Sequence, residues 1–461
     1  MSSTASLPDA VSTLAKTFTG RLLQPADPDY NDVRKVHNGL IDKRPLVIAR
    51  CQGVADIVDA VKLARDGDLD VAVRGGGHNV AGRSTVDGGV MIDLSPMTGI
   101  HVDPARRVAR AQGGLTWNLF NRETQIHGLA TTGGVVSSTG IGGLTLGGGI
   151  GWLMGKHALA LDNLLSVDLV TADGATVTAS QEQNADLFWA VRGGGGNFGV
   201  AATLEYRLHP IGPMITGGVI AYPVSEARDV LRHFRDVTAS LPDELIVFGG
   251  LIHAPDGTRL VAMVVCHCGT PEAGVRAVRP IKEFGSPVMD TIGPIPYTLM
   301  NTMLDDGYPF GALNYWKSSF LTTLSDDAIG TLIDCFTACP TPMGQLLLEH
   351  FHGAVTRIGV TDTAFPHRSE GYNLLVLAEW LDRKDNDACI AWARRTYSSM
   401  ERFVGPSRYV NYLGDDETGD AVMQAAYGPN YQRLLALKAK YDPENFFRMN
   451  HNIRTAAPAD I

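Results

Sequence analysis

The hydrophobic positions between residues 45 and 73 form three successive patterns. The apolar run Pro45–Ala49 predicts a short strand, and the apolar residues from Val54 to Ala64 recur at helical spacing. Gly67 supplies a stop for that helix, and the alternating run Leu69–Val73 predicts a second strand. This strand leads directly into the glycine-rich loop Arg74–Asn79, so the predicted unit is strand, helix, strand and loop.

Similar short patterns continue as far as residue 208. The pair Asp173-Gly174 lies inside the β-rich piece Leu164–Val177 and is typical of a hairpin turn. The other segments predicted in this part are strands at Gly89–Leu94, Arg107–Gln112 and Val200–Leu208, and a helix at Thr116–Gln125.

Between about residues 213 and 405, strand patterns alternate with longer helical ones. We therefore predict an α+β fold in which one antiparallel sheet is backed by helices. The first forty residues show no such pattern and are predicted to form an irregular arm. The predicted strands are Gly217–Tyr222, Leu245–Ile252, Leu260–His267, Leu346–Phe351 and Tyr372–Trp380, and the predicted helices are Ser225–Ser240, Pro271–Lys282, Ser325–Cys335 and Ala388–Phe403.

Composition narrows the class of protein. The 461 residues are 44% hydrophobic and 19% charged, which is typical of a globular chain. A net charge of −10 without a Lys/Arg run argues against nucleic-acid or anionic-membrane partners. Six cysteines without a CxxC pair predict reduced thiols in a cytoplasmic protein. We expect no signal peptide in residues 1–20 and no membrane span, since no stretch of about 18 apolar residues occurs.

Glycine gathers in three clusters, at residues 75–77, 128–151 and 193–199. Glycine lets a backbone approach a ligand closely, and successive N–H groups in such loops bind anions. The clusters therefore indicate a large phosphate-bearing cofactor, with tight turns between short strands as the alternative.

A nicotinamide site fits the third cluster poorly. Gly194, Gly196 and Gly199 satisfy GxGxxG, but the motif must follow a strand and open a helix. The residues after Gly199 have a strand pattern, and no acidic residue follows about 20 positions later. The chain also lacks the GxxxxGK[ST] and GxSxG motifs.

Several motifs together resemble one family. They are RGGGHN (74–79), GIGGLTLGGGIG (140–151), ALDN (160–163), VTADG (170–174), FWAVRGGGGNFGV (188–200), AFPHR (364–368), YVNY (409–412) and YDPENFFR (441–448). The chain resembles the FAD-linked oxidases of the vanillyl-alcohol-oxidase superfamily, in the berberine-bridge-enzyme-like branch. The resemblance covers about residues 40–455.

The resemblance implies a division of the chain into parts. A PCMH-type FAD-binding domain with two α/β subdomains is expected at 41–212, after the arm at 1–40. A substrate-binding domain is expected at 213–405, and a C-terminal segment, 406–461, that returns to the FAD domain.

The resemblance also implies which residues contact the cofactor. His78 matches the histidine that is joined covalently to the flavin 8α-methyl group, although a lone histidine after a strand is otherwise a hydrogen-bonded turn residue. The cofactor-binding residues expected from the motifs are Arg74, Gly75, Gly76, Gly77, His78, Asn79, Gly82, Gly133, Gly140, Gly142, Gly143, Asn163, Gly196, Asn197, Gly199, Val200, Asn450 and Asn452.

Two positions depart from the family. Val136 stands where many relatives have a cysteine that forms a second bond to the flavin, so a single covalent link through His78 is expected. Thr139 stands where relatives usually have an aliphatic residue that gates oxygen. O2 is the expected acceptor, but this threonine leaves a different acceptor open.

The implied reaction is hydride transfer from a substrate C–H to flavin N5. Tyr412 is the first candidate for a base or orienting hydroxyl, and Lys317 is a candidate for the cation that it needs at neutral pH. The alternatives are a buried, hydrogen-bonded tyrosine and a solvated lysine. Leu375 stands where plant relatives have Glu or Gln, so that base is missing.

The run Glu349-His350-Phe351-His352 places both histidines on one face of a strand. If that face looks onto the flavin, His350 and His352 are candidates for substrate contact, with packing or metal binding as alternatives. No third metal ligand stands at a telling spacing, so no metal site is predicted.

Other groups of side chains are assigned simpler roles. Trp316, Tyr308 and Phe310 are expected in the core or in an aromatic pocket wall. Glu379 and Asp415 are expected to cap or pair at the surface.

These observations predict an FAD-dependent oxidase. It transfers hydride from a small amine or alcohol, either a secondary metabolite or a sugar, and reduces O2 to H2O2. The alternatives are a carbohydrate oxidase, an FAD dehydrogenase with another acceptor, and a flavin-binding module without turnover. The expected partners are a small-molecule substrate and O2. A homodimer is compatible with the sequence.

Overall fold

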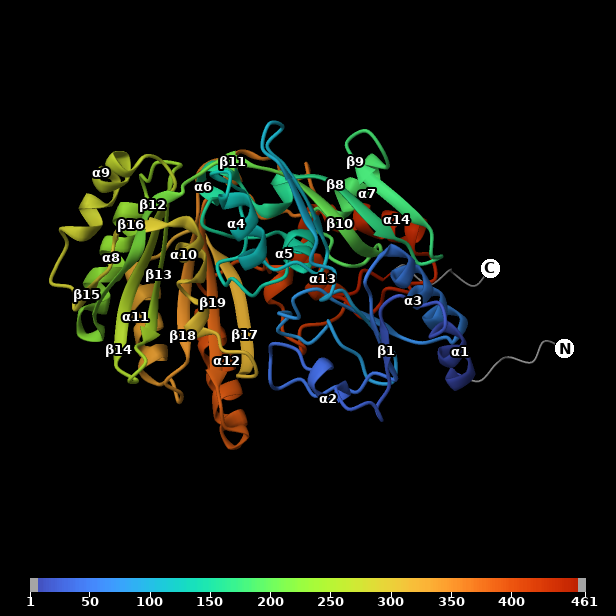
Figure 1. The fold of residues 1–461 in the computed structure, drawn as a ribbon. Helices are drawn as coiled ribbons and strands as arrows, with labels where there is room; N and C mark the ends of the chain where they lie inside the picture. Colours follow the sequence, from blue (N-terminus) through green and yellow to red (C-terminus); the bar gives the residue numbers. More distant parts are fainter. Residues whose placement is uncertain (1–6, 455–461) are drawn as a thin grey trace.

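The computed structural model describes residues 7–454. Two parts lie side by side: the strands before residue 208 form the right-hand part of Figure 1 and those after residue 213 the left-hand part. The last helices of the chain return to the right-hand part. A cavity lies where the two parts meet, because residues of both line it.

The first sheet has the strand order β1-β2-β4-β3. Strands β2 (Val47–Arg50), β3 (Val71–Arg74) and β4 (Val90–Asp93) are parallel, and helix α3 (Val54–Asp66) packs on them. The helix ends at Gly67, as its spacing predicts. Strand β1 (Arg21–Leu23) adds an antiparallel edge to β2.

The irregular arm predicted for residues 1–40 is therefore a wrong assignment within its described part. Helices α1 (Leu7–Leu14) and α2 (Tyr30–Val33) flank β1. Both helices are short, and β1 has only three residues. The helical and strand periods of the hydrophobic pattern therefore do not extend far enough to be recognised in the sequence.

The second sheet is antiparallel, with the order β5-β6-β10-β8-β9. The predicted hairpin joins β8 to β9, and Gly174 has φ +80° in its turn. Strand β10 begins directly after Gly199, so the GxGxxG residues do not open a helix. The strands are β5 (Ile100–Asp103), β6 (Val108–Gln112), β8 (Leu164–Val170), β9 (Thr176–Ser180) and β10 (Val200–Arg207); β7 (Leu129–Ala130) pairs separately with β11 (His209–Pro210).

The third sheet is the predicted antiparallel one, with the order β15-β12-β14-β13-β18-β19-β17 and β16 beside β12. All five predicted strands of this region are confirmed. Strand β17 was missed, because its sequence LNYWKSSFL mixes polar and aromatic residues without simple alternation. The strands are β12 (Met214–Pro223), β13 (Leu245–His253), β14 (Arg259–His267), β15 (Met289–Asp290), β16 (Gly293–Pro296), β17 (Leu313–Leu321), β18 (Gln345–Phe351) and β19 (Gly371–Trp380).

The two faces of this sheet have different neighbours. One face packs with helices α8 (Ala227–Thr238), α11 (Asp326–Thr337) and α12 (Asn386–Met400) into the largest hydrophobic core. The opposite face lines the cavity. Alternate residues of a strand point to opposite faces, so Leu346 and Leu348 enter the core while Leu347 and Glu349 face the cavity.

The four helices predicted in the second part are confirmed as α8 (Ala227–Thr238), α9 (Pro271–Lys282), α11 (Asp326–Thr337) and α12 (Asn386–Met400). Ser325 caps α11 and Thr270 caps α9, each through its side-chain oxygen. The remaining helices are α4 (Trp117–Gln125), α5 (Ile141–Gly147), α6 (Met154–His157), α7 (Ala185–Val191), α10 (Tyr297–Thr302), α13 (Asp420–Tyr427) and α14 (Tyr431–Tyr441).

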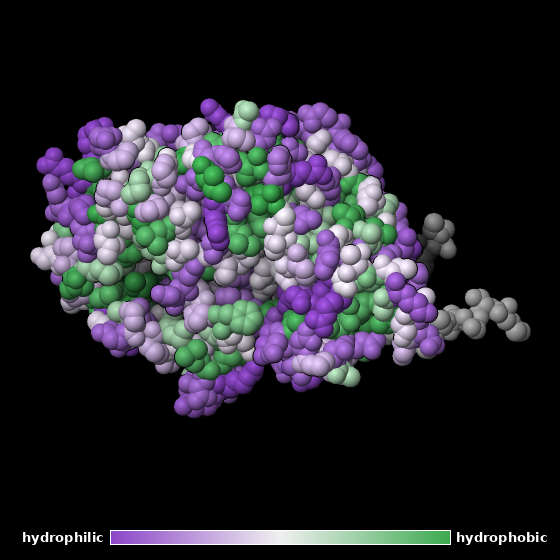
Figure 2. Space-filling model, in the orientation of Figure 1, coloured by the Kyte–Doolittle hydropathy of each residue, from purple (hydrophilic) through white to green (hydrophobic). Residues whose placement is uncertain are grey.

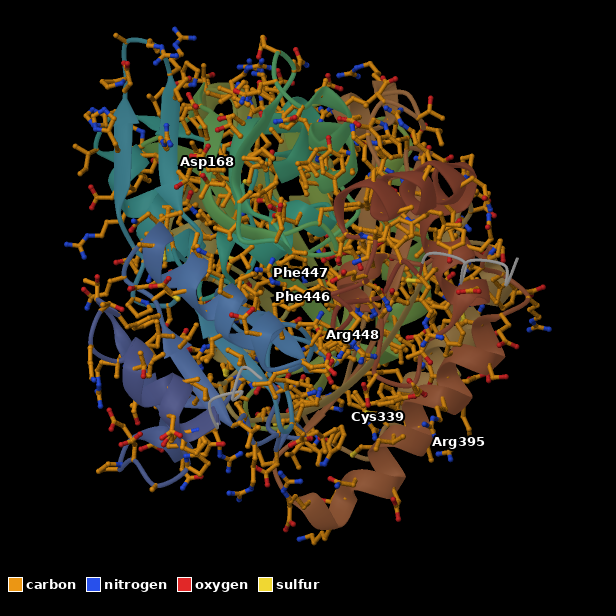
Figure 3. All side chains as sticks on the ribbon, turned by 90° about the vertical axis from the view of Figure 1, so that its right-hand side faces the viewer. Asp168, Cys339, Arg395, Phe446, Phe447 and Arg448 are labelled. Carbon is orange, nitrogen blue, oxygen red and sulfur yellow. The ribbon has the colours of Figure 1, made fainter. Side chains whose placement is uncertain are left out.

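The C-terminal segment is fixed to the first part by buried contacts. Phe446 and Phe447 join the core under α3, and Arg448 Nε lies 2.6 Å from Asp70 Oδ1 (Figure 3). Lys438 Nζ lies 2.6 Å from Asp442 Oδ2 and donates to the carbonyl of Asn197 at 2.8 Å. Both side chains of the Lys438–Asp442 pair are fully buried.

Within residues 7–454, no helix combines the length and apolar character that crossing a bilayer requires. On the face drawn in Figure 2, green apolar side chains occur in small groups among purple and pale ones.

We predict that Lys438→Met lowers the free energy of unfolding by about 3–5 kcal/mol, because the Asp442 carboxylate is left buried without its cation. Urea or thermal denaturation measures the change. Lys440→Met is the matched control, since Lys440 is 58% exposed in its pair with Asp186. We expect it to cost under about 1 kcal/mol. Equal losses in the two variants would contradict the prediction.

Candidate functional site

The cavity between the two parts has a volume of about 800 Å³. Glycine loops of the first part line one side, and strands β13, β18 and β19 line the other. Residues of the C-terminal segment, among them Tyr412 and Asn450, complete it. Such a volume is within the range of pockets that hold a cofactor or a drug-sized ligand.

Two glycine loops touch at the floor of this cavity. A Cβ on Gly76 would lie 2.3 Å from the Gly140 nitrogen, and a Cβ on Gly140 would lie 2.3 Å from the Gly76 nitrogen. Neither position therefore accepts a side chain. Gly77 has φ +72°, a conformation that glycine adopts without strain. This contact brings the 75–79 loop beside the start of α5.

His78 lies at the end of the first loop and lines the cavity. Its Nε2 lies 2.8 Å from Ser138 Oγ, and its ring stacks on that of His37 with centroids 4.0 Å apart. Burial, and to a lesser extent the charge of His37, lowers the pKa of His78 to about 3. The imidazole is therefore neutral at pH 7 and retains a nitrogen lone pair.

The predicted cofactor-binding residues divide into two groups. Twelve line the cavity: Gly75, Gly76, Gly77, His78, Asn79, Gly140, Gly142, Gly143, Gly196, Asn197, Gly199 and Asn450. The other six, which lie outside its lining, are Arg74, Gly82, Gly133, Asn163, Val200 and Asn452.

Two residues of the second group, Arg74 and Gly133, pack behind the wall. The Arg74 guanidinium lies 2.6 Å from Asp93 and donates to the carbonyls of Val33 and Lys35, so it anchors the loop instead of facing the cavity. A Cβ on Gly133 would lie 2.3 Å from the Trp117 ring.

Glu349 is the buried carboxylate among the described residues of the cavity wall, whereas Asp306, which also lines it, is exposed. It projects from β18, where Tyr412 Oη donates to Oε1 at 2.9 Å and Asn373 Nδ2 donates to Oε2 at 2.7 Å. Burial raises its pKa to about 7, although both hydrogen bonds oppose this shift. A carboxyl group with this pKa exchanges a proton near neutral pH.

In the sequence, Glu349 was only a neighbour of the two histidines and had no predicted role. The parity of the strand is the signal that could have assigned one. Glu349 alternates with His350, so one of the two residue types must face away from the cavity.

His350 and His352 occupy the opposite side from Glu349, which corrects the candidate catalytic role that depended on their facing the flavin. Their rings stack on each other at 4.8 Å, and His350 also contacts the Tyr372 ring. Burial and the neighbouring His352 lower the pKa of His350 to about 3. Within residues 7–454 no group of three His, Cys, Asp or Glu side chains is placed to hold a metal ion.

Lys317 also lies outside the cavity lining and does not supply a cation to Tyr412. Its Nζ lies 2.8 Å from Asp416 and 3.2 Å from Glu417. Residues of odd number on β17 point away from the cavity, whereas Trp316 points into it. This corrects the prediction of Lys317 as a catalytic cation.

Tyr412 is placed in the cavity, beside the Trp316 ring at 5.8 Å and the Tyr409 ring at 4.7 Å. Burial and the Glu349 charge raise the pKa of Tyr412 well above its ordinary value. It is therefore a neutral hydrogen-bond donor at pH 7, which favours the orienting role over the role of base.

Two of the three aromatic residues expected in the core or in a pocket wall line the cavity. Tyr308 and Trp316 line the cavity with their rings 6.5 Å apart, while Phe310 is 65% exposed and belongs to neither wall nor core.

Comparison with known proteins identifies the family. Residues 45–180 match the FAD binding domain family, and residues 408–454 match the berberine and berberine-like family. The chain is 32% identical over 451 residues to (R)-6-hydroxynicotine oxidase of Paenarthrobacter nicotinovorans. The alignment covers 95% of this chain and 97% of the relative. The chain belongs to the berberine-bridge-enzyme-like FAD-linked oxidoreductases.

Other relatives show how far this family extends. Glucooligosaccharide oxidase of Sarocladium strictum is 27% identical over 451 residues, covering 88% of this chain and 87% of the relative. The crystal structure of 6-hydroxy-D-nicotine oxidase from Arthrobacter nicotinovorans superposes with a TM-score of 0.88 at 29% identity, covering 95% of this chain and 98% of that one. The PCMH-type α+β fold and the FAD cofactor follow from these matches.

The cavity fits FAD on its own polar atoms as well. His451 lines the cavity and is buried, and neither of its ring nitrogens has a partner among residues 7–454. Ser84 Oγ is likewise buried there without a partner. Buried polar groups are normally satisfied, so these atoms are suited to hydrogen bonds with the cofactor. A Cβ on Gly143 would meet nothing within 4 Å, which leaves room beside the first turn of α5.

The two positions that depart from the FAD-linked family both line the cavity. Val136 and Thr139 lie on the loop between Gly134 and Gly140, in the same wall as His78. The loop is tied to the second part, because Asp305 accepts hydrogen bonds from Ser137 N at 2.8 Å and Ser137 Oγ at 2.5 Å.

Glu379 is the second carboxyl group that burial perturbs strongly. It was expected to pair at the surface, but its exposed fraction is 0% and neither oxygen has a hydrogen-bond partner within residues 7–454. Burial raises its pKa to about 8. Asp415, by contrast, pairs with Arg83 at 3.2 Å and is exposed, as expected.

We predict that Glu379→Leu raises the free energy of unfolding by about 1–3 kcal/mol at pH 8.5. The folded-state pKa of Glu379 is about 8, above the ordinary value of 4.5, so its ionisation penalises folding increasingly as pH rises between these values. The gain measured by denaturation should therefore be smaller at pH 5 than at pH 8.5. Glu401→Leu, at an exposed position, is the control, and an equal or pH-independent gain in Glu379→Leu would contradict the argument.

Proposed function

We propose that this protein is an FAD-dependent oxidase that removes hydride from the carbon next to the nitrogen of a small apolar amine. The single observation that carries the proposal is Glu349, a buried carboxyl group with a pKa of about 7 in an otherwise largely apolar wall. The similarity to (R)-6-hydroxynicotine oxidase supports an amine substrate.

Glu349 performs the proton chemistry in this proposal. An amine enters mostly as an ammonium ion, which has no free lone pair and cannot lose hydride. Deprotonated Glu349 attracts this cation into the cavity and accepts its proton, so that the neutral amine is formed in place. Tyr412 and Asn373 hold one carboxyl oxygen each and so fix the direction of proton transfer.

FAD, when bound, supplies the two-electron acceptor for the substrate hydride and passes the electrons to O2, which gives H2O2. Phe248 of β13 lies opposite Glu349, and Leu375 of β19 lies two residues along the wall, so these apolar side chains exclude water from the face of Glu349. Exclusion of water keeps the neutral amine from being reprotonated by solvent.

We propose that FAD is bound covalently through His78 alone. In the tautomer that this proposal assigns, Nε2–H of the neutral imidazole donates to Ser138 Oγ, so Nδ1 carries the lone pair and is the nucleophilic nitrogen. Val136 has no atom that can form a second bond. We also propose domain boundaries at 41–212, 213–405 and 406–461, and a cytoplasmic location, which the six unpaired cysteines support.

A second candidate function is an FAD dehydrogenase that uses a quinone or protein acceptor, because polar Thr139 lines the cavity. The amine donor and Glu349 would act in the same way. One H2O2 released per amine oxidised in air supports the oxidase, whereas turnover only with an added dye or quinone supports the dehydrogenase.

We predict that acid-precipitated protein retains a yellow chromophore and that His78→Ala releases it as free FAD. Peptide mass spectrometry should place one flavin on His78. His101→Ala, at an exposed histidine outside the cavity lining, is the control and should retain the flavin. A flavin that stays in the His78→Ala pellet would place the bond elsewhere.

We predict that Glu349→Gln lowers kcat/KM for amine oxidation by about 10²–10⁴-fold, because the amide cannot accept the proton. In the unsubstituted enzyme kcat/KM should rise with pH through about 7, since Glu349 must be deprotonated, and this acid limb should be absent from Glu349→Gln. Peroxide release or anaerobic flavin bleaching measures the profile.

Tyr412→Phe tests the same assignment independently. Loss of the Tyr412 hydrogen bond removes a group that lowers the pKa of Glu349, so the acid limb should move to higher pH. An unchanged profile in both variants would exclude Glu349 as the base.

A further inference from the structure

The cavity wall beyond Glu349 consists of side chains in register across three strands. Glu349 lies opposite Phe248 of β13 and Asn373 of β19. Two residues outward along β18, Leu347 lies opposite Gly250 and Leu375. Two residues further, Gln345 lies opposite Leu377. At about 3.4 Å per residue, this wall extends about 14 Å from Glu349 to Gln345.

The outer part of this wall, which we call the groove, is apolar. Leu347, Leu375 and Leu377 face it, and the amide oxygen of its polar residue Gln345 already accepts from Tyr308 at 3.3 Å. A sugar would need hydrogen-bond partners for each hydroxyl that leaves water. Leu347, Leu375 and Leu377 offer none, which leaves the amide nitrogen of Gln345 as the one donor among these four side chains.

Small residues keep the groove open on its β13–β14 side. Gly250 has no side chain, and the residue paired with it on β14 is Ala262. Both line the cavity. A larger side chain at Ala262 would therefore occupy space next to Leu347 that is now free.

The opposite wall is held in place by the cofactor loop. Met303 and Leu304 line the cavity between α10 and the short helix Asp305–Gly307. Asn301 Nδ2 donates to the Gly134 carbonyl at 2.7 Å, and Asp305 holds Ser137. The groove therefore has two fixed walls, one on the sheet and one on this segment.

The groove leads from Glu349 to solvent. Pro255, Pro342 and Leu381 line its outer end, and Leu381 is 71% exposed. An apolar side chain so exposed at the mouth of an apolar groove extends the same surface outward.

We propose that the substrate has an elongated apolar body of about 14 Å that lies in the groove while its amine head is held at Glu349. Ala262 and Leu381 then determine how long a body is accepted. The inference rests on the proposed function for the head group, and the groove supplies the rest of the substrate class: an amine on an alkyl, prenyl or fused aromatic skeleton, not on a sugar.

Two amine series test the proposal on the flavin-loaded enzyme. N-methylalkylamines from butyl to dodecyl are substrates, assayed by anaerobic flavin bleaching. Alkyltrimethylammonium ions of the same lengths have no nitrogen lone pair and serve as non-reacting probes, with Kd measured by calorimetry. We expect kcat/KM to rise and Kd to fall by about 2–4-fold per methylene, and to level off near ten carbons, when the groove is filled.

Three variants locate the effect. Ala262→Phe should abolish the dependence on chain length beyond the first few carbons in both series. Leu381→Asp should weaken only the longest members, by about 3–10-fold. Ile126→Asp is the matched control, since Ile126 is also 71% exposed but lies outside the cavity lining, and it should change neither series.

The outcomes separate this inference from the proposed function. Short and long amines that are oxidised and bound equally well would overturn the groove assignment and leave the amine oxidase intact. Probes that bind more tightly with length, while no amine bleaches the flavin, would support the groove and overturn the proposed reaction. A length dependence that Ala262→Phe leaves unchanged would place the apolar body elsewhere and overturn the inference.

Discussion

The contact between the backbones of Gly76 and Gly140 is the constraint on which the site depends. Each glycine occupies the space that the other's Cβ would need, so the loop after β3 and the loop before α5 meet without side chains between them. His78 and Ser138 come within hydrogen-bond distance as a result. Val136 and Thr139, the two positions at which this chain differs from the family pattern, line the cavity from the same loop as Ser138.

Burial acts on the carboxyl groups of Glu349 and Glu379 in different ways. Glu349 loses solvent but gains two donors, so its pKa is raised only into the neutral range, where a proton can be accepted or released. Glu379 loses solvent and gains no hydrogen-bond partner among the described residues. No group is therefore placed to exchange a proton with it. Partners, and not burial alone, therefore separate a carboxyl group suited to catalysis from one that only costs stability.

Much of the fold was predictable because the strands of the third sheet and the helices behind it have clear periods. Strand β17 was not, since Trp316 faces the cavity while its neighbours on the strand pack elsewhere, and both faces contain polar groups. The motifs located the glycine loops and Tyr412. The sequence could not show which residues of each strand, odd or even, face the cavity, and His350 and Lys317 proved to be on the other face. Which face is free depends on where the helices pack, and a local sequence pattern does not contain this information.

The C-terminal segment has a consequence for the order of events during synthesis. Asn450 and His451 line the cavity, and Phe446 and Phe447 pack under α3, although they follow His78 by most of the length of the chain. A nascent chain still attached at these residues has the glycine loops but not the wall that closes over them. The wall over the glycine loops is therefore complete only after these last residues have been synthesised and have packed under α3.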